Sequence, residues 1–494
     1  MTENLITDRH SGEYLRRLTA NYKLTPATLA HKLNPRWVAS PHLMYISSRV
    51  ATSIRRGNAR IIISVPPRHG KSELITKYTT TWCLEHFPHW NTILSTYGAE
   101  LSTDFGREVR DIIMSNEALL SVRIRKDAAR TSNWKTDFGG GMAAVGIGGA
   151  ITGRGANVLL IDDYLKEIKE AMSATTKQYI WNWFKTVAFT RIEPGGSCII
   201  IATRWATDDL IGRILAENPG GKWEYICLPA LAEEGDILGR AVGEPLFPER
   251  YSLEALEEIK DTLGSYFFNA LYQQNPVNDE SALTNVDWLQ VVDIMPMLGN
   301  APQGRIWDLA ATVDGGDYTA GTHMMADPSN AYVYITNVIR RRASPQTIEM
   351  LVRQTAIADG VNCTVYIEQE PGASGKQLVD HYVRNVLPEF TVVPVTPRDG
   401  KAVRAQPFLA AAEAGRVKLL KGAWNAAFIS EFGDFPGGAH DDQIDTAAIG
   451  FMQLVGKKTF QTSWGRRLRQ TNLITSTGVP MISDRRGTRV TFGR

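Results

Sequence analysis

The sequence has little of what builds disulfide frameworks, zinc sites or membrane anchors. Its 494 residues include only four cysteines, Cys83, Cys198, Cys227 and Cys363. They form no Cys-x-x-Cys pair, so neither a disulfide framework nor a zinc site is indicated, and a reducing compartment is expected. No run of about 18 apolar residues occurs, so no membrane-spanning helix is expected. The first residues lack the apolar segment of a secretion signal.

Net charge is also scarce. Lys and Arg number 54 against 52 Asp and Glu, a formal charge of +2, which by itself argues against a nucleic-acid partner. The average hides an asymmetry, because residues 456–494 hold nine basic residues and one acidic residue and so carry +8, while the preceding residues carry −6. A basic tail therefore follows an acidic body.

What is present is an ordinary globular composition, with 43% hydrophobic and 21% charged residues, which excludes global disorder and collagen-like or coiled-coil rods. In the first half, continuous apolar runs alternate with helical patterns, which predicts an α/β fold with a parallel sheet covered on both faces. These expected strands are 60–65, 92–97, 157–161 and 197–202. A second mixed region combines strands at 305–308, 332–336 and 363–368 with helices at 403–414 and 442–454.

The sequence predicts five segments. They are a helical preamble over 1–50 that is broken at Pro26, Pro35 and Pro41, a first domain over 51–235, a connector over 236–300 rich in turn signals with one helical stretch, a second domain over 301–455, and a mobile basic tail over 456–494.

A candidate nucleotide site begins at residues 65–72, Val-Pro-Pro-Arg-His-Gly-Lys-Ser, which follow a strand and open a helix. The Gly-Lys-Ser ending matches a phosphate-binding loop, in which backbone N–H groups cradle the phosphates, the lysine neutralises their charge and the serine holds Mg²⁺. The predicted ATP-binding residues are Pro66, Pro67, Arg68, His69, Gly70, Lys71 and Ser72. Val65 stands where the pattern has its first glycine, so a chance Gly-Lys-Ser turn stays an alternative.

Two carboxylates that end an apolar strand complete this site. Asp162 is predicted to hold Mg²⁺ and Asp163 to orient or deprotonate the attacking water. The next apolar strand ends at Thr203, which is placed to sense the γ-phosphate. Arg154 in a Gly-rich stretch, or Arg68 inside the loop, is the candidate arginine finger, although Arg154 is equally well explained as a surface side chain.

A second group of carboxylates lies in the second domain. Asp308 and Glu368 each end a strand, Asp441 and Asp442 begin a helix, and Asp445 lies one turn on. Carboxylates gathered from two strands and a helix can bind two divalent ions for in-line phosphodiester cleavage, and hard oxygen ligands favour Mg²⁺ or Mn²⁺. The alternative is that these residues are helix N-cap and strand-end surface acids.

Seven sequence blocks, taken together, resemble the large terminase subunits of tailed bacteriophages or prophages. Between about residue 40 and residue 455 they read PPRHGKSE, TGRG, LLIDD, ATRW, LGSY, LYQQNP and HDDQID, in the order and spacing of that family. The resemblance implies an ASCE-type P-loop ATPase domain followed by an RNase H/RuvC-like nuclease domain. It implies an enzyme that drives double-stranded DNA into a procapsid with ATP and cuts concatemeric DNA.

The resemblance also assigns roles. Lys71 and Ser72 match the Walker A ending, whose first glycine is often absent in the family, and Asp162 matches the Walker B acid. Asp163 stands where many members have a glutamate, and Thr203 falls in the coupling motif. Arg154 and Arg68 match arginines proposed as fingers in different members. The nuclease metal ligands are matched by Asp308, Glu368, Asp441 and Asp442, with Asp317 and Asp445 as weaker matches.

The implied cofactors are ATP with Mg²⁺ in the first domain and two Mg²⁺ or Mn²⁺ ions in the second. The implied partners are double-stranded DNA, a small terminase subunit, a portal protein and further copies in a ring on the portal, with no membrane. The implied location is the host cytoplasm, transiently at the portal vertex and not in the mature virion. A helicase–nuclease of DNA repair or recombination and a non-catalytic assembly scaffold remain alternatives. The basic runs Arg340–Arg342 and Arg123–Lys135 either follow DNA or are solvated faces.

Overall fold

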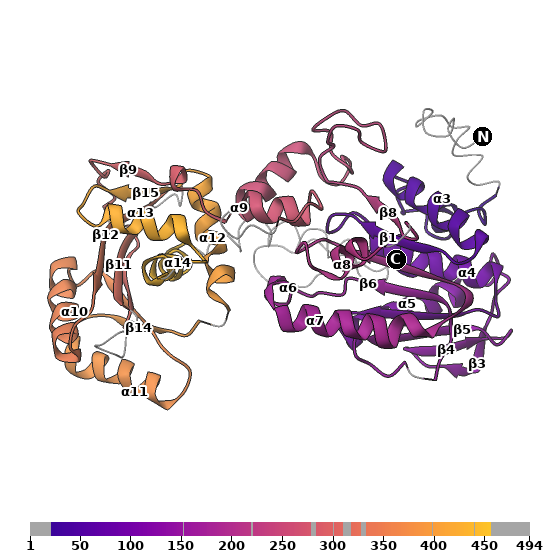
Figure 1. Cartoon of the computed structure of the whole chain (residues 1–494), viewed down its shortest axis with the longest axis horizontal. Helices are drawn as coiled ribbons and strands as arrows, with labels where there is room; N and C mark the ends of the chain where they lie inside the picture. Colours follow the sequence, from indigo (N-terminus) through magenta and orange to yellow (C-terminus); the bar gives the residue numbers. More distant parts are fainter. Residues whose placement is uncertain are drawn as a thin grey trace, which may run out of the picture. The chain divides into compact units, whose positions relative to one another are not determined.

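The computed structural model describes residues 21–151, 153–218, 221–277, 283–299, 301–309, 318–327, 332–397, 399–438 and 440–455. The chain forms two compact units, Met1–Ala282 and Leu283–Arg494 (Figure 1). Both units combine helices with a sheet that contains parallel strands, which confirms the expected α/β class. Within the described ranges, no helix combines the length and the apolar character needed to cross a bilayer.

The first unit is built around an eight-stranded sheet in the order β3-β4-β5-β2-β6-β7-β1-β8. Its strands are β1 (Arg60–Ser64), β2 (Asn91–Thr96), β3 (Ile124–Ala129), β4 (Asn133–Thr136), β5 (Gly141–Gly146), β6 (Ala156–Asp162), β7 (Ile192–Ala202) and β8 (Glu224–Cys227). The run from β5 to β8 is parallel, and β3 and β4 add an antiparallel edge. The four strands expected from apolar runs are β1, β2, β6 and β7, and all four form.

Helices cover both faces of this sheet. The helices of this unit are α2 (Pro26–Leu33), α3 (Pro41–Arg56), the π-helix η2 (Glu73–Thr79), α4 (Thr80–His86), α5 (Ala99–Ser115), α6 (Ile168–Met172), α7 (Ala174–Trp183), the π-helix η3 (Phe184–Ala188), the 3₁₀ turn η4 (Phe189–Arg191), α8 (Leu210–Ala216) and α9 (Leu253–Leu271). Ile61 and Ile63 of β1 belong to one buried core and Ile62 to another. Side chains of a strand alternate between faces, so the sheet lies between two cores.

Two of the prolines expected to interrupt the N-terminal helical region stand at the first residue of a helix. Pro26 is the first residue of α2 and Pro41 the first residue of α3. The first N–H groups of a helix have no partner inside it, so proline is tolerated there. Because α2 ends at Leu33 and α3 begins at Pro41, the helical region is interrupted in the segment that contains Pro35 and leads to Pro41.

The second unit is built around a mixed seven-stranded sheet in the order β14-β13-β10-β11-β12-β15-β9. Its strands are β9 (Gln290–Val292), β10 (Gln303–Asp308), β11 (Thr319–Ala326), β12 (Val333–Arg341), β13 (Thr364–Glu368), β14 (Val392–Val395) and β15 (Val417–Leu420). The helices are η6 (Val286–Trp288, 3₁₀), α10 (Pro345–Asp359), α11 (Ala373–His381), η7 (Tyr382–Val386, π), α12 (Lys401–Glu413), α13 (Asn425–Asp434) and α14 (Asp442–Leu454).

Strand β10 contacts different helices on its two faces. Trp307 is fully buried in a core with Ile348 and Val352 of α10. On the other face, a Cβ added to Gly450 of α14 would lie 2.5 Å from Ile306 Cδ1, so only glycine lets this helix approach so closely. Alternation then places Asp308, two residues after Ile306, on the α14 face.

The expected connector 236–300 contains the division between the two units. Helix α9 packs in the first unit through Leu256 and Phe268, with a non-helical Gly264 (φ 75°) inside it, and β9 pairs with β15 in the second unit. The expected basic tail, residues 456–494, lies outside the described residues.

Candidate functional site

The phosphate loop connects β1 to η2. Arg68 and Gly70 both have positive φ, 63° and 83°, and this left-handed conformation is one that glycine adopts without strain. The turn carries Lys71 into the protein, where it is only 5% exposed. The structure therefore has the strand, turn and helix that a phosphate loop requires, although Val65 replaces the first glycine of the pattern.

Asp162 lies at the buried end of β6, beneath the start of the phosphate-loop helix. Its carboxylate accepts hydrogen bonds from Ser72 Oγ at 3.0 Å and from Thr76 Oγ1 at 2.5 Å. Burial, and then the neighbouring charge of Asp163, raises the pKa of Asp162 above the usual range of an aspartate. Two hydroxyl donors thus hold a buried acid beside the serine that would share an Mg²⁺ ion with it.

Thr203 lies between the lysine and the second acid because β7 lies between β1 and β6 in the sheet. Lys71 Nζ donates to Thr203 Oγ1 at 2.7 Å and lies 3.2 Å from Asp163 Oδ1. The backbone N–H of Thr203 donates to the same carboxylate oxygen at 3.2 Å. Parallel strands end at one edge of a sheet, where ligands bind in α/β folds, and this edge gathers the expected nucleotide-binding side chains.

A cavity of about 550 Å³ opens at this edge. Its lining includes Pro67, Arg68, Gly70, Lys71, Ser72, Asp163 and Thr203, together with Tyr97, Lys166, Trp205 and Arg250, which the sequence did not single out. The two candidate finger arginines differ, because Arg68 lines the cavity whereas exposed Arg154 donates to Asn133 Oδ1 at 3.0 Å and does not line it.

His69 was predicted to bind ATP, but its side chain does not line this cavity. The ring is buried and stacks on Tyr251 at 4.9 Å, and the carbonyl oxygen of His69 lies 2.8 Å from His42 Nε2. Burial lowers the pKa of His69 to about 4 and that of His42 to about 3, so both rings are neutral. These histidines therefore pack inside the protein and hold the backbone of the loop in place without lining the cavity.

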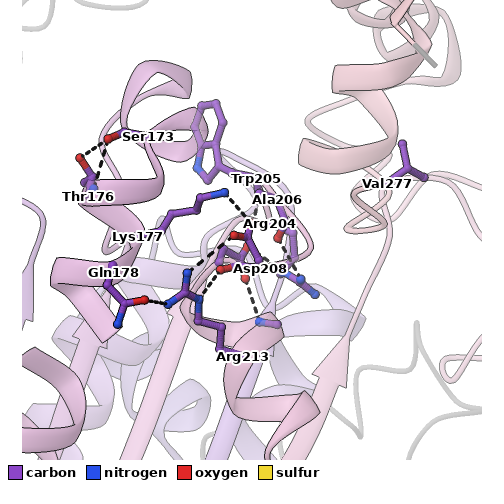
Figure 2. Close-up of polar contacts among 12 residues, drawn as sticks. Ser173, Thr176, Lys177, Gln178, Arg204, Trp205, Ala206, Asp208, Arg213 and Val277 are labelled. Atoms are coloured by element: carbon purple, nitrogen blue, oxygen red, sulfur yellow. Dashed lines mark hydrogen bonds and ion pairs between the residues drawn. The ribbon is translucent and has the colours of Figure 1, made fainter. Parts of the chain in front are cut away.

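The loop that follows Thr203 is fixed by charge pairs (Figure 2). Arg204 Nε donates to buried Asp209 at 3.0 Å, and Lys177 of α7 reaches Asp208 at 2.5 Å. The backbone N–H of Arg204 also donates to Gln274 Oε1 at 3.1 Å. The segment after β7 is therefore tied both to α7 and to the residues that follow α9.

The second candidate site is a carboxylate centre in the second unit. Asp308 and Glu368 end the parallel neighbours β10 and β13, and Asp445 lies on α14. Carboxylate oxygens of these three residues all lie within 4.8 Å of one another. Burial, followed by the charges of Glu368 and Asp442, raises the pKa of Asp308 to about 7. Burial also raises the pKa of Glu368.

The acids at the start of α14 divide between two environments. Asp441 accepts a hydrogen bond from Lys401 Nζ at 2.5 Å, whereas Asp442 is 3% exposed and acts on Asp308 through its charge. Asp445, the weaker match in the sequence, is the acid grouped with Asp308 and Glu368, and Arg404 of α12 binds both of its oxygens. Asp317 lies outside the described residues.

A third group lies on the opposite face of the second sheet. His323, Asp359 and Cys363 each have a ligand atom within 4.8 Å of the others. Both oxygens of Asp359 already accept hydrogen bonds from Arg305 at 2.8 Å. Burial also raises the pKa of the Cys363 thiol to about 12, which disfavours the thiolate that binds metals, so we assign the group to the core and not to a metal centre.

Comparison with protein-family models assigns both units. Residues 62–291 match the model described as terminase large subunit, T4likevirus-type, N-terminal. Residues 305–453 match the terminase RNaseH-like domain, so the two matches span more than three quarters of the chain. This chain belongs to the large terminase subunit family. The resemblance in the sequence is thereby confirmed, and the terminase chain has its two domain models in the expected order.

Solved structures that resemble this terminase chain are distant in sequence. The large terminase of a thermophilic bacteriophage in complex with ATP-gamma-S has 11% identity and a TM-score of 0.46, over 84% of this chain and 97% of that one. The bacteriophage HK97 large terminase has 12% identity and a TM-score of 0.37, over 90% and 99%. The magnesium-bound large terminase nuclease of thermophilic phage G20c has 12% identity and a TM-score of 0.26, over 36% of this chain and 99% of that one. No curated protein matches the chain.

Several polar residues of the terminase sites were missed by sequence reasoning. Thr76 lies one helical turn after Ser72 on the same face, so its spacing was a usable signal. Lys401 and Arg404 lie one turn apart on α12, which the sequence placed only as a helix. Their pairing with Asp441 and Asp445 depends on how α12 packs on α14, and no local pattern reports that packing.

Proposed function

We propose that this terminase chain is a two-site packaging enzyme, with ATP hydrolysis in the first unit and divalent-metal-dependent DNA cleavage in the second. The proposed domains are the ATPase over 51–235 and the nuclease over 301–455, with 1–50 and 236–300 as accessory segments and 456–494 as a basic tail. The observation that carries the proposal is the presence, in separate units, of a phosphate loop paired with two acids and a cluster of half-buried and buried acids.

In the ATPase site, Lys71 now binds Asp163 and Thr203. A γ-phosphate would compete for the lysine, and Asp163 would then be released to orient the attacking water. Ser72 and Asp162 would hold Mg²⁺, which neutralises charge on the phosphates. Thr203 would report this change through its neighbour Arg204 to Gln274, because the backbone N–H of Arg204 already donates to Gln274 Oε1.

The arginine finger has two candidates with different consequences. Arg68 lines the cavity of its own subunit. Exposed Arg154 does not, so it would act only on a neighbouring subunit of a ring. In NTPases that use such a finger, the arginine raises the rate by about 10³–10⁵.

In the nuclease site, the chain supplies hard oxygen ligands that suit Mg²⁺ or Mn²⁺. Glu368 Oε2 is buried with no hydrogen-bond partner among the described residues, so it is available to a cation. Two bound ions would supply stabilisation of the attacking and leaving oxygens of a phosphodiester. Asp308, Glu368 and Asp442 would hold these ions with Asp445, whose partner Arg404 lies 3.9 Å from Glu368 and would keep both carboxylates oriented.

The proposed partners follow from family membership. They are double-stranded DNA, a small terminase subunit, a portal protein and further copies of this chain in a ring on the portal. The protein would act in the host cytoplasm at the portal vertex and be absent from the mature virion.

The proposal is tested by assaying the wild-type chain side by side with the Lys71→Ala and Asp308→Asn variants. Wild-type protein should hydrolyse ATP, package duplex DNA into procapsids without displacing a strand, and cut plasmid with Mg²⁺ or Mn²⁺. Strand displacement would favour a helicase–nuclease. Wild-type protein that is folded but neither hydrolyses ATP nor cuts DNA would favour a scaffold. Undiminished ATPase in a folded Lys71→Ala chain, beside undiminished cleavage in an Asp308→Asn chain, would contradict both site assignments.

A further inference from the structure

A basic and aromatic cluster lies in the second unit, outside the carboxylate group. The guanidinium carbons of Arg340 and Arg342 each lie over the ring of Tyr318, 3.9 Å from its centre. The ring of His440 meets Tyr318 edge-on at 5.1 Å, and His440 immediately precedes Asp441 in the sequence. One tyrosine thus orders two arginine side chains beside the start of α14.

Strand register relates this cluster to the carboxylate centre. Ala320 of β11 pairs with Asp308 of β10 on one side and with Arg340 of β12 on the other. Directly paired residues project from the same face of a sheet, so Arg340 shares the face of Asp308. Neighbouring strands are about 4.8 Å apart, which separates the two backbones by about 10 Å. Glu431 of α13, 3.7 Å from Arg340, lies on this face too.

The arginines of the cluster have hydrogen-bonding capacity to spare. Nε and one terminal nitrogen of Arg340 are buried and have no partner among the described residues, and the side chain of Arg342 is exposed. These two Arg340 donors are covered by protein, whereas the Tyr318 ring covers only the flat face of the exposed Arg342 guanidinium and leaves its edge donors open. That edge matches the two oxygens of a phosphate in a bidentate manner.

Resting on the nuclease function proposed above, we infer that Arg340, Tyr318 and Arg342 form a grip for a DNA backbone phosphate next to the cleavage centre. The ring holds the two guanidinium groups in place. Exposed Arg342 contacts the phosphate and Arg340 adds its positive charge, on a strand whose backbone lies about 10 Å across the sheet from that of Asp308. The contact is independent of base sequence, because contacts to backbone phosphates orient the DNA but carry no sequence information.

Because side chains alternate between the two faces of β12, the neighbouring Arg341 provides a matched control for Arg340 and Arg342. Arg341 belongs to the same basic run as Arg340 but projects from the other face of the strand. Arg341→Gln therefore removes the same charge without touching the grip. Arg342 is the better primary target, because Arg340 also lies near Glu431 and its loss is more disruptive to folding.

The test measures Mn²⁺-dependent cleavage of linear duplex DNA by the full chain, with KM and kcat determined separately. Arg342→Gln and Tyr318→Leu should raise KM about tenfold with kcat little changed, because the grip contributes uniform binding. Tyr318→Phe keeps the ring and should match wild type. Arg342→Lys keeps the charge but loses the planar fork, so it should restore only part of the affinity. Arg341→Gln should stay within about twofold of wild type, as expected where no specific contact is lost.

A second measurement separates failure of the grip from failure of the nuclease assignment. Binding of a labelled duplex to the same variants is titrated against salt, and loss of one phosphate contact lowers the salt slope by about one unit. If wild-type protein does not cut DNA but the slope falls only in the grip variants, the nuclease function is wrong and the grip stands. If cleavage and binding of Arg342→Gln and Tyr318→Leu equal those of Arg341→Gln, the grip is overturned.

Discussion

The two acid-bearing sites balance their charges in different ways. In the phosphate-loop site, buried Asp162 is held by the hydroxyls of Ser72 and Thr76, and Asp163 pairs with Lys71. In the carboxylate centre, acids from two strands and a helix crowd together, and the compensating cations both come from α12. The acids of the first site are already paired with donors and a cation, whereas the second site retains repulsion that bound cations would relieve.

This difference predicts which change weakens each site most. The nucleotide site would receive its cation together with ATP. Its activity should therefore be most sensitive to removal of the hydroxyl donors that orient Asp162. The carboxylate centre would take ions directly from solution. Its activity should therefore be most sensitive to removal of a carboxylate ligand.

The largest effect is expected at Asp445. Because its carboxylate is grouped with Asp308 and Glu368 while Asp441 pairs with Lys401, Asp445→Asn should lower metal-dependent cleavage by more than about 100-fold and Asp441→Asn by about tenfold. Plasmid nicking rates measure both, and ATPase activity should stay unchanged in both. Equal losses in the two variants would show that the grouping around Asp445 is not the one used in catalysis.

A smaller effect is expected at Thr76. Thr76→Val removes a donor to a buried carboxylate, which costs about 1.5–3 kcal/mol and should lower ATPase activity at limiting Mg²⁺ at least about tenfold. Thr80→Val is the matched control, since the hydroxyl of Thr80, the first residue of α4, donates to the backbone carbonyl of Thr76 in η2 and not to Asp162. DNA cleavage should be unaffected by either change. If Thr76→Val hydrolyses ATP as well as Thr80→Val does, Asp162 does not depend on this donor.

The smallest effect concerns stability and pH. The folded pKa of Asp308, about 7, exceeds the unfolded value of about 3.9, so the folded state binds more protons between these pH values. In chelator-treated protein, the second unit should therefore lose at most about 1.4 kcal/mol of stability per unit as pH rises through this window. Asp308→Asn should flatten the dependence. Urea unfolding read by proteolysis of the second unit measures it, and a slope unchanged by the substitution would contradict the assignment.

Much of the first site could be predicted from the sequence because its parts are local. The Gly-Lys-Ser turn and the acid pair each follow a continuous apolar strand, and parallel strands bring their carboxyl ends to one edge. Thr76 is the one strong contact that was missed. Pro26 and Pro41 stand at the first positions of α2 and α3, where proline is favoured, so these prolines mark where helices begin.

The second site was less predictable because its arrangement is tertiary. The sequence identified Asp308 and Glu368 from strand ends but did not single out β11, which pairs with β10 and directly follows Tyr318. Which of the three acids of α14 joins the group depends on the rotation of that helix against the sheet, where Gly450 permits close packing on Ile306. Rotation of this kind is set by packing and is not visible in residue spacing.

The most direct test is a calorimetric Mn²⁺ titration of the nucleotide-free chain. We expect Mn²⁺ to bind wild-type protein and Asp162→Asn alike, and to lose its binding when Asp308→Asn and Glu368→Gln are combined. Binding that survives the double substitution but disappears in Asp162→Asn would contradict the account, because the solution-filled cation site would then lie in the phosphate-loop unit.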